Sequence, residues 1–202
     1  MSSYAAKQKE MKEKVAKQAI YEAALKVISQ NKHESLRMQE IAEAAGIATG
    51  TLYNYFDCKE SLLYYVDGRL REDFLAKMQS FAEMQGPPLQ RLTNLTMEIL
   101  GYCEEHHAVF DLADKFGIAS RIPKKEKIAK LDRAFDCIKS ILDDGVKDRL
   151  FRRIDTASAA RCYLYTLIGI IEVQRFIGER NLSKRGEELL KTFQQHLEIQ
   201  DS

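Results

Sequence analysis

The chain has 202 residues, 45% of them hydrophobic and 30% charged, a composition that fits a globular protein with a buried core and excludes a disordered or fibrous chain. The 31 lysines and arginines nearly balance the 30 aspartates and glutamates, so the formal charge is only +1 and a nucleic-acid-binding surface would have to be a local basic patch. Only 10 glycines and 3 prolines interrupt apolar residues that recur at spacings of three and four. We therefore predict an all-α fold of long helices.

The first predicted helix covers residues 15–28 and follows a basic segment. Its apolar positions form one stripe: Val15, Ala19, Ile20, Ala23, Val27 and Ile28. Between Lys7 and Lys17, five lysines accompany two glutamates, a local excess of three positive charges. Charge alone favours a solvated helix face over a binding surface for this segment. The polar run at 29–35 ends the helix.

A helix, a tight turn and a second helix are predicted between residues 37 and 60. The first short helix covers 38–45, Gly46 can adopt the left-handed conformation that ends a helix, and the second starts at 49 in the segment TGTLYNYF. Four apolar residues are spaced so that both short helices pack on the first helix as a three-helix core: Ile41, Ile47, Leu52 and Phe56.

The opposite face of the second short helix carries small and hydrogen-bonding residues. Thr49 and Tyr53 are four positions apart and are flanked by Gly50, Thr51 and Asn54. Such groups suit a helix that enters the major groove of DNA. A glycine early in an exposed helix costs up to about 1 kcal/mol relative to alanine, so Gly50 indicates that the backbone approaches a partner closely. DNA is a good candidate for that partner.

Further helices are predicted along the rest of the chain. One runs from about 59 to 84 and ends before the prolines at 87 and 88, and a long one follows with apolar residues between 89 and 100. A shorter helix covers 107–116, the segment 120–127 is expected to be a loop, and the next helix has a stripe formed by Ile128, Leu131, Phe135, Ile138 and Leu142. The last helix carries Leu189, Leu190, Phe193 and Leu197.

The penultimate helix, capped by Asp155 or Thr156, is apolar on more than one face. One set of apolar residues is Leu164, Leu167, Ile168 and Ile171, and a second is Tyr165, Ile170 and Val173. A helix that is apolar nearly all round needs a second surface to cover it, and a symmetric partner helix is the simplest choice. The apolar segment at 162–173 is too short to cross a bilayer, which takes about 20 residues.

The segment IAEAAGIATGTLYNYFDCKESLL resembles the helix-turn-helix of the TetR family of regulators, with its pattern IA-x-x-AG-x-x-x-GTLY-x-YF-x-x-KE-x-L. The resemblance covers about the first 65 residues closely; the rest resembles the family in helix order. It implies a helix-turn-helix DNA-binding domain at 1–65, with the motif at about 37–56, and a helical effector-binding and dimerisation domain at 66–202. It also implies a homodimer, formed through the two C-terminal helices, that reads both halves of a near-palindromic operator.

The resemblance also implies roles for individual residues. Thr49 and Gly50 lie where family members contact base edges, with Asn54 beside them, and four residues lie where members hold phosphates: Thr51, Tyr53, Tyr55 and Lys59. Hydroxyls and an ammonium can bond phosphate oxygens, and Lys59 would act beside the positive end of its helix. For Tyr55, a structural role as a partly buried aromatic side chain of the DNA-binding domain is about as good an interpretation as a phosphate contact. Leu52 and Phe56 are expected to pack inside.

Two positions depart from the family pattern. Arg37 stands where the family has a capping Thr, three residues before Glu40, and Ala48 replaces the usual Ser or Thr before the recognition helix. The second change costs about 1 kcal/mol unless Thr49 takes over as cap. We hypothesise that Arg37 compensates by contacting a DNA phosphate.

Signals for a metal or a ligand are weaker. Cys103 and His106 have a C-x-x-H spacing, but no second pair of ligands is visible, so we expect no metal site and no cofactor. The family implies an apolar pocket for a small-molecule effector, for which the candidates are Tyr102, His106, Phe110 and Tyr163.

We therefore predict a ligand-responsive regulator that binds operator DNA. The resemblance implies that it is a repressor, as members of the family usually are. The alternatives are a DNA-binding regulator without a ligand and a helical enzyme, for which no nucleophile, paired-carboxylate or phosphate-loop signature is found. Four scattered cysteines and the lack of a secretory leader favour a cytoplasmic protein that is not in a membrane.

Overall fold

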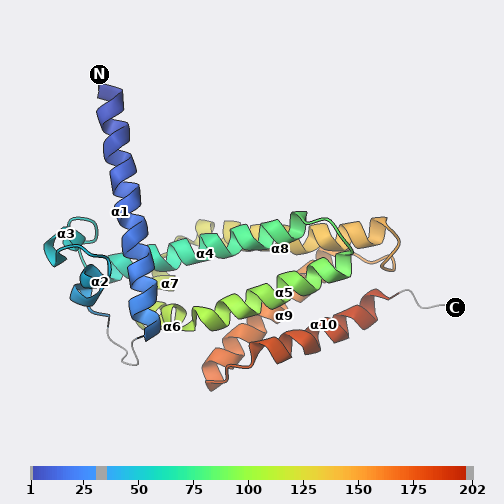
Figure 1. Cartoon of the computed structure of the whole chain (residues 1–202). Helices are drawn as coiled ribbons and strands as arrows, with labels where there is room; N and C mark the ends of the chain where they lie inside the picture. The colour runs from blue at the N-terminus through green and yellow to red at the C-terminus, as the bar shows by residue number, and fades with distance from the viewer. Residues whose placement is uncertain (1, 31–35, 199–202) are drawn as a thin grey trace. The chain divides into compact units, whose positions relative to one another are not determined.

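The computed structural model of the chain describes residues 2–30 and 36–198, which form helices and contain no strand. The all-α prediction is confirmed. The helices in chain order are α1 (Ser2–Gln30), α2 (Met38–Ala44), α3 (Thr49–Tyr53), α4 (Lys59–Glu83), α5 (Pro88–Glu105), α6 (His107–Lys115), α7 (Ile118–Arg121), α8 (Lys124–Lys147), α9 (Thr156–Ile177) and α10 (Leu182–Leu197) (Figure 1). Most of the polar run predicted to end the first helix, residues 31–35, lies outside the described part.

The chain divides into two compact units. The N-terminal unit comprises Met1–Leu70 and His106–Arg121, so it holds α1, α2, α3, the first half of α4, α6 and α7. The C-terminal unit comprises Arg71–Glu105 and Ile122–Ser202. The segment 1–65 lies wholly within the N-terminal unit, which also contains two short helices from the middle of the chain.

The core of the N-terminal unit forms where α2 packs on the second half of α1 and α3 packs on α2. Ile20, Ala24 and Ile28 of α1 are buried. The predicted stripe is wrong at its start, because Val15 is 63% exposed and Ala19 is also exposed. The helix begins at Ser2 rather than near 15, and its first half extends beyond α2 and α3 (Figure 1).

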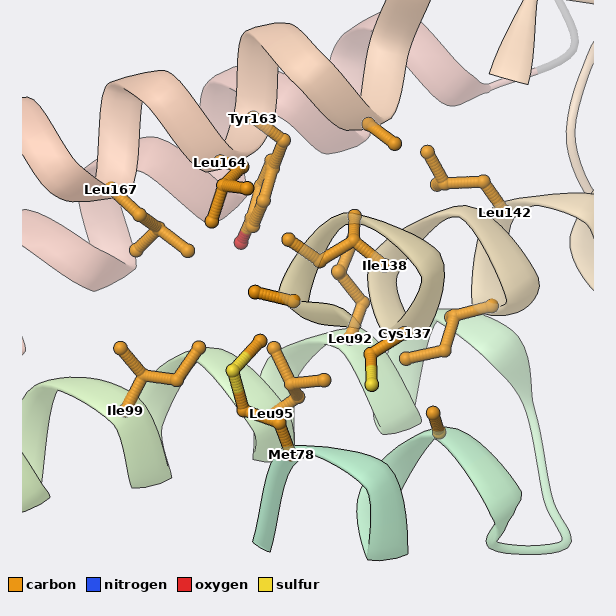
Figure 2. Close-up of a cluster of buried hydrophobic side chains, with 14 of the residues drawn as sticks. Met78, Leu92, Leu95, Ile99, Cys137, Ile138, Leu142, Tyr163, Leu164 and Leu167 are labelled. Atoms are coloured by element: carbon orange, nitrogen blue, oxygen red, sulfur yellow. The ribbon is translucent and has the colours of Figure 1, made fainter. Parts of the chain in front are cut away.

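The core of the C-terminal unit lies between α5, α8, α9, α10 and the end of α4. Figure 2 shows Met78 of α4, Leu95 of α5, Ile138 of α8 and Leu167 of α9 converging on it. The helices α5 and α10 pack on each other, and a Cβ at Gly186 of α10 would overlap a methyl of Leu100. Only glycine therefore fits at this close approach without displacing its neighbours.

A buried arginine also connects three helices of this unit. The guanidinium of Arg91, at the start of α5, lies 2.6 Å from a carboxylate oxygen of Asp144 on α8 and donates to the carbonyl of Ala82 on α4. Arg91 is 7% exposed, so its charge is compensated where water is largely excluded.

The predicted loop at 120–127 is wrong for most of its length. The helix α7 ends at Arg121 and α8 begins at Lys124, with Pro123 at its N-cap. Proline has no N–H to lose there, so it begins the helix instead of excluding one. In α8, Ile128 and Leu131 are 46% and 44% exposed, so the predicted stripe is buried only in the second half of the helix.

The penultimate helix, α9, has the apolar surplus that its sequence predicts. Asp155 is the cap, because its carboxylate accepts bonds from the N–H groups of Ala157 and Ser158. Several large apolar side chains of α9 are exposed: Tyr165, Ile168, Val173, Phe176 and Ile177. No helix within residues 2–30 and 36–198 is both long and apolar enough to span a membrane.

Candidate nucleic-acid interface

The turn between α2 and α3 is fixed by backbone geometry and by one buried anchor on each helix. Gly46 has φ +69°, and the N–H of Ile47 bonds the carbonyl of Ala42 at 3.0 Å. Ile41 and Leu52 are fully buried and Phe56 is 6% exposed. The predicted helix, tight turn and helix are confirmed, although α3 is short and ends at Tyr53.

Neither short helix has a side-chain cap. Ala48 is the N-cap of α3 and Thr49 is its first residue, so Thr49 does not take over as cap. Arg37 is the N-cap of α2 and makes no capping bond; its guanidinium lies 3.5 Å from the carboxylate of Glu40. The starts of both helices are therefore held by backbone bonds and by packing, and the side chain of Arg37 is 71% exposed.

The outer face of α3 is open to solvent. Tyr53 is 47% exposed, and Gly50 and Asn54 are also exposed. A Cβ built at Gly50 has no atom within 4 Å, so nothing inside the protein requires glycine there. Thr49 and Thr51 are half-buried. Residues 49, 50, 53 and 54 therefore form a contiguous surface that is accessible within the N-terminal unit.

Lys59 starts α4 beside this surface. Its ammonium lies 4.7 Å from the centre of the Phe116 ring, and Phe116 is the C-cap of α6. A cation over an aromatic face is attracted by the ring quadrupole, which holds the ammonium near the N-terminus of α4. Sequence analysis missed this contact because the two residues are far apart in the chain and share no pattern.

A cleft of about 620 Å³ adjoins the end of α3. It is lined by Gln8, Lys9, Lys12, Glu13 and Lys17 of α1 together with Asn54 and Tyr55. Tyr55 is half-buried, which fits both interpretations left open by the sequence. Lys17 lies 2.7 Å from Glu13, and this hydrogen bond raises the pKa of Lys17 and lowers the pKa of Glu13.

The four residues predicted to bind an effector fall into both units. Tyr102 and Tyr163 belong to the C-terminal unit, and His106 and Phe110 belong to the N-terminal one. The ring of Tyr102 is buried, with its centre 5.5 Å from that of Phe74.

Tyr163, which lies among the core side chains drawn in Figure 2, is 1% exposed and is already hydrogen-bonded. Its hydroxyl lies 2.6 Å from the hydroxyl of Thr96, which donates its own proton to the carbonyl of Leu92, so Tyr163 is the donor. Burial raises the pKa of Tyr163. Among the residues that the structure describes, including Cys103, no group of three His, Cys, Asp or Glu side chains could hold a metal ion.

Residues 20–66, which contain the whole α2-turn-α3 motif, match the family model described as "Bacterial regulatory proteins, tetR family". The chain carries the helix-turn-helix segment of the TetR family. It is therefore a DNA-binding transcriptional regulator of the helix-turn-helix type.

Relatives extend the TetR likeness to different extents. The HTH-type transcriptional regulator YhgD of Bacillus subtilis is 25% identical over 156 residues, 77% of this chain and 82% of YhgD. The HTH-type transcriptional repressor KstR of Mycolicibacterium smegmatis is 41% identical over 73 residues, which is only 36% of either chain. Both are named as regulators of transcription, not as enzymes.

A solved structure of a transcriptional regulator covers most of the fold. The regulator FadR from Bacillus subtilis, crystallised with stearoyl-CoA, superposes with a TM-score of 0.62 over 89% of this chain and 98% of its own, at 17% identity. At that identity the comparison shows a shared fold alone. Because most of both chains is superposed, the likeness extends beyond the helix-turn-helix to the architecture of the C-terminal unit.

Proposed function

We propose that this TetR-family protein is a repressor that binds a near-palindromic operator as a homodimer and leaves it when a small molecule binds. We assign DNA binding to about the first 65 residues and effector binding and dimerisation to the rest. The observation that carries the proposal is the surface of α3, where Gly50, Tyr53 and Asn54 are exposed while Leu52 beneath them is fully buried. A rigid helix with an open polar face is what the major groove accepts.

In this proposal Thr49 and Gly50 contact base edges and Asn54 lies beside them. Thr51, Tyr53, Tyr55 and Lys59 hold phosphates, supported by their hydroxyl or ammonium groups and by the place of Lys59 at the start of α4. Arg37 binds a further phosphate, supported by the high exposure of its side chain.

DNA binding is tested by selecting bound duplexes from a random-sequence pool and then measuring affinity for the selected site by fluorescence anisotropy. Tyr53→Phe should weaken binding about 10-fold on all duplexes, because it removes one hydrogen bond to a charged acceptor. Tyr64→Phe is the matched control, since Tyr64 is 38% exposed on α4 in the same unit but outside the proposed surface. No enrichment of any sequence, or equal losses of affinity in both variants, would refute the proposed interface.

The residues assigned to base edges require a different measurement. Thr49→Val keeps the shape of the side chain and removes its hydroxyl, so the preferred base at one position of each half-site should change while the other positions persist. Arg37→Ala should instead leave the preferred sequence unchanged and make the salt dependence of affinity shallower by about 0.9 in log–log slope for each phosphate that is no longer neutralised. An unchanged slope would remove Arg37 from the interface.

Dimerisation is assigned to α9 and α10 because α9 exposes a row of large apolar side chains. Tyr165, Ile168 and Phe176 fall on one helical face and are 62%, 36% and 91% exposed. A second copy of the same face would cover them symmetrically. Two such subunits would present their α3 helices to successive major grooves about 34–36 Å apart.

Light scattering coupled to size exclusion tests this assignment. Ile168→Glu would place a carboxylate in both halves of the apolar interface and should weaken the dimer at least 100-fold, since each unpaired buried charge costs more than about 1–3 kcal/mol. Ile128→Glu makes the same change at a similarly exposed position on α8, where the dimer should persist. A monomeric wild type, or a dimer in both variants, would contradict the assignment of α9 and α10 to the dimer interface.

In this proposal a small-molecule effector releases the protein from its operator. Because FadR was crystallised with stearoyl-CoA, a long-chain acyl-CoA is the first effector to test. The proposed binding residues are Tyr102 and Tyr163 within the C-terminal unit and His106 and Phe110 within the N-terminal unit. Stearoyl-CoA should displace the protein from its selected operator, whereas free coenzyme A should not. If neither stearoyl-CoA nor a panel of apolar metabolites displaces it, the regulator without a ligand is the better description.

A further inference from the structure

The first half of α1 is a helix with almost no support from the rest of its unit. Every described side chain from Lys7 to Val15 is exposed, and burial in the core begins at Ile20. With a rise of 1.5 Å per residue, the fourteen residues from Ser2 to Val15 extend for about 21 Å. Exposed helix of this length gains little from packing, so its residues are free to serve a partner.

One side of this extension forms a cleft with the residues that follow α3. Gln8, Lys9, Lys12, Glu13 and Lys17 line it from α1, and Asn54 and Tyr55 line it from the other side. Glu13 is neutralised by Lys17, 2.7 Å away, so Lys9 and Lys12 leave the cleft with a net charge of +2.

Four lysines in the first half of α1 form two pairs by their position around the helix. At 100° per residue, Lys9 and Lys12 lie 60° apart and share the side that lines the cleft. Lys7 and Lys14 lie on the opposite side of the helix, together with the exposed Met11. Charge alone favours the interpretation that the basic segment is a uniform solvated face. The positions of the lysines around the helix instead separate a side that lines the cleft from a side that does not.

We propose that the cleft between the α1 extension and the end of α3 is a second DNA-binding surface, in which Lys9 and Lys12 hold phosphates of the strand bordering the groove that α3 enters. The proposal rests on the function proposed above and extends its interface to residues that the family motif, which matches from residue 20 onward, does not contain.

The charge of the cleft and its continuity with the α3 surface favour DNA as the molecule that binds there. The cleft is positive, which suits a polyanion, and Gln8 and Asn54 add amide donors for phosphate oxygens. Lys9 and Lys12 are about 4.5 Å apart along the helix axis, so both flexible side chains can reach successive phosphates of one strand. Asn54 and Tyr55 belong both to the cleft and to the proposed α3 interface, so the duplex at one surface necessarily passes the other.

The test compares two double variants of the full-length protein on the duplex selected by the wild type. Lys9→Gln with Lys12→Gln removes two charges from the cleft, and Lys7→Gln with Lys14→Gln removes two from the opposite side of the same helix. In a dimer the first variant leaves four phosphates without their ammonium partners, so the log–log slope of affinity against salt should become shallower by about 3.6. The second variant should keep the slope of the wild type.

The selected base sequence should be unchanged in the cleft variant, because interactions with phosphates carry no sequence information. Hydroxyl-radical footprinting should show weaker protection at the outer edges of each half-site while the centre stays protected. Equal slope changes in the two variants would mean a diffuse charge effect and would overturn the cleft. An unchanged slope in the cleft variant would overturn it too, whereas failure of the wild type to select any DNA would instead overturn the proposed function.

Discussion

Gly50→Ala separates the requirements of folding from those of DNA binding. A methyl group at this position meets no protein atom within 4 Å, and Gly50 lies within α3. Alanine restricts the unfolded chain more than glycine and favours helix, so the substitution should stabilise the N-terminal unit by about 0.4–1 kcal/mol. A position chosen only for folding would therefore carry alanine.

The same methyl group should weaken DNA binding if the backbone of α3 touches the bases. Adding one carbon to a closely packed interface costs about 1–3 kcal/mol, which corresponds to an affinity about 5- to 150-fold weaker. The gain in stability and the weaker binding should appear in one variant, which general misfolding cannot produce.

Chemical denaturation and fluorescence anisotropy on the selected duplex measure the two effects. Gly68→Ala is the control, because Gly68 lies in the interior of α4, also has no atom within 4 Å of a built Cβ, and is outside the proposed interface. It should gain stability and keep its affinity. Wild-type affinity in Gly50→Ala would show that the backbone does not approach DNA closely, and a loss of stability would refute the reasoning about open space.

Two further predictions concern the C-terminal unit. Gly145→Ala should lower the unfolding free energy by about 1–3 kcal/mol or more, because its Cβ would overlap the ring of Phe151. The control Gly101→Ala on α5 adds a Cβ that meets no atom within 4 Å, so it should be neutral or stabilising. Equal denaturation midpoints for the two variants would contradict this prediction. The pKa of Asp155 is below its ordinary value because the hydroxyl of Ser158 and backbone N–H groups bond the carboxylate. The extra stability of wild type over Asp155→Asn should therefore be complete above pH 3.8, the ordinary pKa of aspartate, and should disappear as the pH falls through the lower pKa of the folded state. A difference in Tm between the two proteins that does not change with pH would be inconsistent with a charged cap.

Local patterns predicted the helix-turn-helix well because its determinants lie close together in the sequence. The left-handed Gly46 and the buried Ile41 and Leu52 each follow from a few neighbouring residues. The cap of α9 was predicted in the same way but only as Asp155 or Thr156, and the structure has Asp155. The extent of α1 could not be obtained in this way. Residues 2–14 form helix through the high intrinsic propensity of lysine, glutamine, glutamate and alanine, whereas apolar periodicity detects only the part that packs.

Contacts between distant segments were beyond the sequence. Nothing near Lys59 indicates the ring of Phe116, and nothing near Asn54 and Tyr55 indicates the cleft with α1. The loop predicted at 120–127 failed for a local reason, since a proline that begins a helix and one that breaks a helix look alike until its neighbours are placed. The division of the candidate effector residues between two units likewise depends on how the chain folds.

Leu52 is the one residue of α3 that is buried. The other four positions of this helix contribute little to the stability of the fold, so they can change while the protein still folds. Duplicated copies of such a gene could diverge toward new target sites by substitutions at 49, 50 and 53 alone, with 54 just beyond. A library randomised at these four codons should yield mostly folded proteins, and could supply regulators reprogrammed for chosen promoters.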